Sequence, residues 1–105
     1  VGKGVFVAHG CVLSVDVSVG NFCIINVNSV IGHHSTLCIN VNVNPMVFIA
    51  GNVTICENVV LGAASKILQG VVVGKLCVVG IGSTVLMNLK DSSTVWPMLN
   101  KISTS

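Results

Sequence analysis

Residues 19–55 read VGNFCIINVNSVIGHHSTLCINVNVNPMVFIAGNVTI, and every sixth residue in this stretch, starting with the first, is Val, Ile or Leu. The same spacing continues toward both ends of the chain. Its members are Val1, Val7, Leu13, Val19, Ile25, Ile31, Leu37, Val43, Ile49, Ile55, Leu61, Ile67, Val73, Val79 and Val85. A fixed short period is typical of a solenoid, in which each repeat covers the apolar face of its neighbour. The next step of six reaches Asp91, where the pattern stops.

A second column of residues lies four positions after each aliphatic residue and contains mostly Val, Ser and Cys. The two columns predict short strands with one large and one small residue facing inward. Cys11, Cys23 and Cys77 fall in the small column, where a thiol acts as a small apolar group, so we expect all three to be buried. The residue directly after each aliphatic position is often Gly, Ala or Asn. We expect these residues to form tight corners with unusual φ angles.

Composition excludes several functional classes. Only 8% of residues are charged, and the net charge of +2 comes from five Lys and no Arg. A nucleic-acid partner normally requires a basic stripe, so none is expected. The uncharged stretch from Ser35 to Cys56 contains four Asn and a Pro and is unsuited to spanning a membrane. The five Cys include no CxxC pair, and no signal-peptide pattern is visible. We therefore expect no metal site and a cytoplasmic location.

Three segments carry a resemblance to a known family. They read IINVNSVIGHHSTL at 24–37, NVNVNPMVFIAGNVTI at 40–55 and LGAASKILQGVVVGKLCVVGIGSTVL at 61–86. Together they resemble the acyltransferase domain of the NeuD/PglD group, which comprises sialic acid O-acetyltransferases and nucleotide-amino-sugar N-acetyltransferases. The resemblance implies an all-β, left-handed parallel β-helix, in which three hexapeptides close one coil. We expect about five such coils over residues 1–89 and a C-terminal tail over 90–105. The family's N-terminal nucleotide-sugar-binding domain is expected to be absent.

The resemblance implies a catalytic site at His33 and His34. The family's general base matches His33, which would accept a proton from an amine or hydroxyl as that atom attacks the thioester of acetyl-CoA. The next position in the family is usually acidic and orients the base, but here it is His34, which supplies no negative charge. Gly51 follows His33 by one full coil, which is three hexapeptides. We expect it to leave space beside the base for the thioester, with a backbone N–H that supports the oxyanion.

The resemblance also implies acetyl-CoA as the co-substrate. Asn42 stands at a position that is often His in the family and contacts acetyl-CoA or the acceptor. Ala63 and Ile81 match cofactor contacts and, being three hexapeptides apart, are expected to line one groove on successive coils. The family assembly implies a homotrimer in which acetyl-CoA binds between His33 of one subunit and the groove of the next. The tail at 97–101 replaces the family's Gly-Asn-Pro-Ala-Lys loop and keeps only Lys101.

The function implied is acetyl-CoA-dependent transfer of an acetyl group to an amine or hydroxyl of a sugar or nucleotide sugar. Two alternatives stay open. The γ-type carbonic anhydrases share the fold and bind zinc through three His, but His9 is far from the adjacent pair His33 and His34, which is not the expected spacing. A catalytically weak or structural β-solenoid trimerisation module is the other alternative. The missing acidic residue at position 34 and the altered tail favour it.

Overall fold

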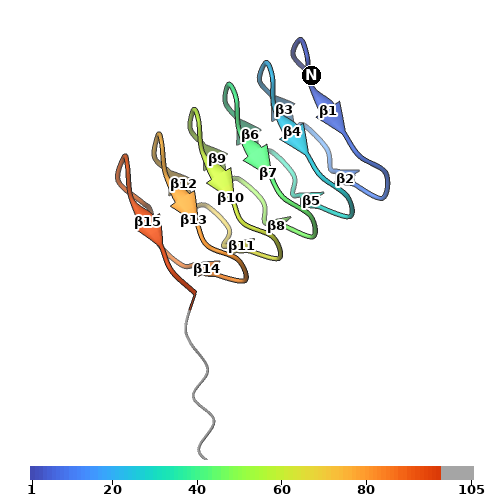
Figure 1. Cartoon of the computed structure of the whole chain (residues 1–105). Helices are drawn as coiled ribbons and strands as arrows, with labels where there is room; N and C mark the ends of the chain where they lie inside the picture. Colours follow the sequence, from blue (N-terminus) through green and yellow to red (C-terminus); the bar gives the residue numbers. More distant parts are fainter. Residues whose placement is uncertain (98–105) are drawn as a thin grey trace, which may run out of the picture.

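The computed structural model describes residues 1–97 as a stack of two-residue parallel strands wound into a three-sided prism (Figure 1). Successive strands belong to successive faces. Sheet A contains β1 (Phe6–Val7), β4 (Ile24–Ile25), β7 (Asn42–Val43), β10 (Val60–Leu61), β13 (Val78–Val79) and β15 (Thr94–Val95). Sheet B contains β2 (Val12–Leu13), β5 (Val30–Ile31), β8 (Phe48–Ile49), β11 (Lys66–Ile67) and β14 (Thr84–Val85). Sheet C contains β3 (Ser18–Val19), β6 (Thr36–Leu37), β9 (Thr54–Ile55) and β12 (Val72–Val73).

The core is the column of aliphatic residues that the period of six predicts. In sheet B each strand pairs in parallel with the strand one coil further on, which stacks Leu13, Ile31, Ile49, Ile67 and Val85 on one another. The last four are at most 2% exposed, whereas Leu13 is half-buried because its coil is the first and has no coil on its outer side. Parallel pairing and inward aliphatic columns confirm the predicted all-β solenoid.

The corners differ from the expectation in one respect. Positive φ angles occur three residues after the aliphatic position, as at His34 (58°) and Leu76 (61°), and not one residue after it. Glycine directly after the aliphatic residue has another cause, which is the close approach of neighbouring coils. A Cβ added to Gly32 would lie 2.5 Å from the carbonyl carbon of Ala50. The small residue therefore makes room between backbones, and the left-handed residue turns the chain.

Several Cys and Ser side chains of the inner small column donate hydrogen bonds to the following coil, whereas the buried hydroxyls of Ser65 and Ser83 have no partner among the described residues. The thiol of Cys23 donates to the carbonyl of Cys38 at 2.9 Å, and the hydroxyl of Ser35 donates to the carbonyl of Ala50 at 2.8 Å. Cys23 and Cys77 are fully buried, as expected, and burial raises the pKa of the Cys23 thiol. The expectation is wrong for Cys11, which is only half-buried because it belongs to the open first coil.

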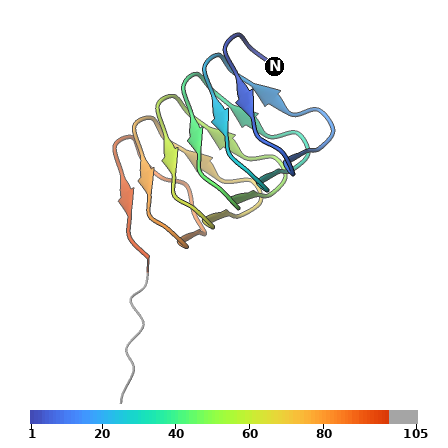
Figure 2. The ribbon, with the colours of Figure 1, turned by 45° about the vertical axis from the view of Figure 1, so that its right-hand side comes forward.

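The C-terminal end of the prism extends further than the repeat predicts. β15 joins sheet A beside β13, although the expected boundary was residue 89 (Figure 2). Leu61 pairs with Val79 across a full coil, whereas Val79 pairs with Val95. The last coil is thus two residues shorter than the others. A count in steps of six therefore does not detect its strand β15. Residues 98–101, which complete the predicted tail loop, lie outside the described residues.

Candidate functional site

His33 and His34 lie on the corner that joins β5 to β6, between sheets B and C. His34 has the left-handed backbone conformation. Histidine is one of the few residue types that adopt this conformation readily. This turn brings the two rings edge to face, with an interplanar angle of 83°. The Nδ1 atoms of the two rings are 3.1 Å apart. At this distance one ring nitrogen donates a hydrogen bond and the other accepts it.

A carboxylate on the preceding coil contacts this pair. The backbone N–H of His34 donates to the carbonyl of Val15 at 3.0 Å, which stacks the two corners directly. As a result, Oδ2 of Asp16 lies 3.2 Å from Nε2 of His34. The negative charge that position 34 lacks is therefore supplied through the stacking of coils. Sequence reasoning did not single out Asp16, although its position one full coil before His34 was the available signal.

Gly51 does not leave open space beside His33, and this expectation is corrected. The imidazole of His33 lies over the glycine, so that a Cβ added to Gly51 would meet Nε2 of the ring first and would be 2.6 Å from Cε1. The two corners are stacked by the N–H of Asn52, which donates to the carbonyl of His33 at 2.8 Å. The His33 ring thus packs into the space that a side chain at position 51 would fill. The region that the thioester was expected to fill is occupied by the imidazole.

The expected acetyl-CoA residues lie elsewhere on the prism. Ala63 and Ile81 occupy the corner between sheets A and B, on successive coils joined by a 2.9 Å hydrogen bond from Gly82 N–H to the Ala63 carbonyl. Asn42 is half-buried at the start of β7, between Ile24 and Val60 of the neighbouring strands. Within one chain, the structure therefore stacks Ala63 on Ile81 as predicted. It does not bring them to the corner that carries His33.

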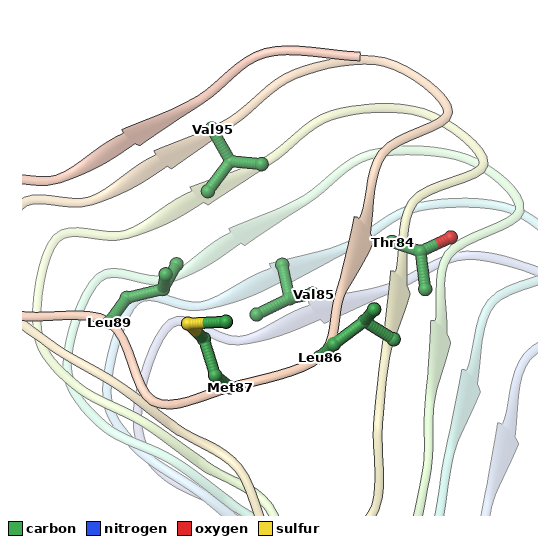
Figure 3. A pocket seen from close by; sticks show the side chains of 6 residues that line it. All are labelled: Thr84, Val85, Leu86, Met87, Leu89 and Val95. Atoms are coloured by element: carbon green, nitrogen blue, oxygen red, sulfur yellow. The ribbon is translucent and has the colours of Figure 1, made fainter. Parts of the chain in front are cut away.

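A small apolar hollow of about 250 Å³ lies at the C-terminal end of the prism (Figure 3). It is lined by Thr84, Val85, Leu86, Met87, Leu89 and Val95. The hollow exists because the last coil is short and leaves the inner column partly uncovered. None of its side chains titrates, so it offers no group for proton transfer and is not part of the histidine site.

The described part of the chain contains neither a metal-ligating cluster nor a membrane-spanning helix. Across residues 1–97, no group of three or more His, Cys, Asp or Glu is arranged to hold a metal ion. No helix in the same residues has the length and apolar character needed to cross a membrane.

Solved structures are similar to the chain over most of its length. WeeI from Acinetobacter baumannii matches with a TM-score of 0.86 and 23% identity, covering 89% of this chain and 46% of that one. The acetyltransferase domain of PglB from Neisseria gonorrhoeae in complex with acetyl coenzyme A matches with a TM-score of 0.70 and 20% identity, covering 89% and 50%. PerB from Caulobacter crescentus in complex with CoA and GDP-perosamine matches with a TM-score of 0.60 and 22% identity, covering 85% and 53%.

These likenesses show the fold. The chain is a left-handed parallel β-helix of about five coils, the architecture implied by the resemblance to the NeuD/PglD group. It spans about half the length of these solved chains. No protein-family model and no curated protein sequence matches the chain.

Proposed function

We propose that the chain is the catalytic β-helix of an acetyltransferase that moves the acetyl group of acetyl-CoA to an amine or hydroxyl of a sugar or nucleotide sugar. The observation that carries this proposal is the corner at His33, where Nδ1 is engaged by a second histidine. That contact commits one ring nitrogen, whereas the other, Nε2, faces Gly51 and makes no hydrogen bond within residues 1–97. The likeness to the PglB acetyltransferase domain in complex with acetyl coenzyme A supports the choice of donor.

The proposed reaction uses His33 first as a base and then as an acid. Nε2 of the neutral ring takes a proton from the acceptor as the acceptor nitrogen or oxygen bonds to the thioester carbonyl carbon. The tetrahedral intermediate then collapses, the carbon–sulfur bond breaks, and the departing CoA sulfur takes the proton from the imidazolium. Atoms and charges balance, and the ring returns to its neutral form. Imidazole suits both steps because its ordinary pKa is about 6.5.

We further propose that the working unit is a homotrimer. His33 lies on the edge between sheets B and C, whereas Ala63 and Ile81 lie on the edge between sheets A and B. A full face of the prism separates the two edges, so one chain cannot offer both to the same thioester. Packing the His33 edge of one subunit against the Ala63 edge of the next joins them and excludes water. The five free cysteines favour a reducing compartment such as the cytoplasm for this assembly.

The test is an acetyl-transfer assay with acetyl-CoA and a panel of amino sugars, sialic acids and nucleotide amino sugars, in which mass spectrometry detects the product. We expect His33→Ala to lower kcat by about 100-fold or more, because a general base is lost, while the fold is retained. His9→Ala is the matched control, since His9 is also an exposed corner histidine. A His33→Ala variant as active as its parent contradicts the mechanism. Trimers that turn over no acceptor and bind no acetyl-CoA support the structural module instead.

A further inference from the structure

We propose that Asp16 is a positioning residue that acts through His34 to set which nitrogen of His33 carries the proton. This inference rests on the proposed function for its consequence in catalysis, but the proton arrangement itself is a property of the free protein. Asp16, His34 and His33 form a continuous chain, with 3.2 Å from Oδ2 of Asp16 to Nε2 of His34 and 3.1 Å between the two Nδ1 atoms.

The direction of the hydrogen bonds follows from the carboxylate. An ionised carboxylate only accepts, so Nε2 of His34 must carry the hydrogen that points to Asp16. In a neutral ring the other nitrogen is then bare, and Nδ1 of His34 accepts a hydrogen bond from Nδ1 of His33. His33 therefore carries its hydrogen on Nδ1, and its Nε2 has a free lone pair. That tautomer is the one a general base needs.

No other charged group on this corner can take the place of Asp16. Among the described residues, the corner positions stacked on His33 and His34 are Gly51 and Asn52, followed by Gln69 and Gly70. The flanking strands β2, β3, β5 and β6 present no titratable side chain. Once His33 takes up a proton, Asp16 is the one negative charge at the end of the hydrogen-bonded chain.

The turn at Asp16 does not itself require an acid. Asp16 has the left-handed conformation with φ of 56°, and Asn occupies the equivalent corner position with φ of 57° to 59° at Asn28, Asn40, Asn52 and Asn58. An amide therefore serves this turn as well as a carboxylate. Asp16→Asn should leave the fold intact while it removes the charge and replaces a pure acceptor with a group that both donates and accepts.

The first measurement is the tautomer of each histidine by long-range ¹⁵N–¹H NMR of the whole chain, at about pH 8, which is above the ordinary pKa of imidazole. His9→Gln removes the third histidine and identifies its signal. We expect the hydrogen of His33 on Nδ1 and that of His34 on Nε2. In Asp16→Asn we expect His33 to become a mixture of both tautomers. A parent protein with the His33 hydrogen on Nε2, or with an even mixture, overturns the proposal, as does a variant with unchanged tautomers.

The second measurement is the kinetic effect of the same variant. We expect Asp16→Asn to lower kcat by about tenfold or more with little change in KM, because the base is misprotonated while substrate contacts are kept. Glu57→Gln is the matched control, since it removes one negative charge from a different corner, where Glu57 pairs with Lys75 at 3.6 Å. Equal kcat in parent and Asp16→Asn overturns the positioning role. If no acceptor is acetylated at all, the proposed function fails, and the tautomers still decide the proton arrangement.

Discussion

The histidine corner shows that a charged group missing from one coil of a solenoid can be supplied by the neighbouring coil. Position 34 carries a second imidazole where the resembled family has an acid, and Asp16 supplies the carboxylate from the preceding coil. The motif alone was sufficient to single out His33 and His34. Asp16 could have been found only by combining that motif with the stacking of one coil on the next. The role of Gly51 could not be predicted, because the direction in which the His33 ring turns is a rotamer choice that the repeat does not determine.

We predict that Gly51→Ala lowers kcat by about tenfold or more with little loss of stability, because the added methyl group displaces the His33 ring. The backbone of Gly51 is outside the left-handed region, so alanine fits its φ angle. The added methyl group would meet the His33 side chain, which can move. Gly20→Ala should lower stability and leave kcat unchanged, since its methyl group would lie 2.7 Å from the carbonyl carbon of Cys38 in the neighbouring backbone. Thermal unfolding and kinetics of both variants check this. Full activity in Gly51→Ala contradicts the placement of the ring.

The strands were predictable because a period of six sets both which residue faces inward and which coil it meets. Register, face and core membership all follow from that single count, as the stacking of Ile31 on Ile49 shows. The corners were less predictable, because Gly and Asn occur both at the close-approach position and at the left-handed position. The short last coil was not predictable either. It places Val79 beside Val95, which breaks the period on which the count depends.

The left-handed corner positions lead to a stability prediction. Leu76 has φ of 61° and is 58% exposed, so it has a strained backbone and gains little from burial. Leu76→Asn should raise the free energy of unfolding by about 1 kcal/mol, because Asn tolerates this conformation better. Leu68→Asn is the control, since Leu68 is 50% exposed but has no positive φ. Chemical denaturation of both variants measures the difference. Equal effects of the two substitutions would show that strain at Leu76 is not the cause.

The prism as a whole presents flat outer faces with apolar side chains. On sheet A, Phe6, Ile24, Val60 and Val78 are between 36% and 58% exposed and lie in one outward column, which Asn42 interrupts between Ile24 and Val60. Exposed apolar side chains on one face favour association. The edges that carry His33 and Ala63 are separated by a face, so an assembly is also what the proposed chemistry needs. Both observations support a working unit made of several copies of the chain.

Subunit complementation tests this shared site. His33→Ala removes the base but leaves the groove, and Ala63→Phe fills the groove but leaves the base, so each variant alone should be inactive. The two chains are co-expressed with different affinity tags, and only assemblies that carry both tags are collected. In a cyclic trimer, either mixture contains one intact site in three, so we predict about a third of the parent rate of acetyl transfer. Mixed assemblies as inactive as the two variants, or no assemblies carrying both tags, would contradict a site built between subunits.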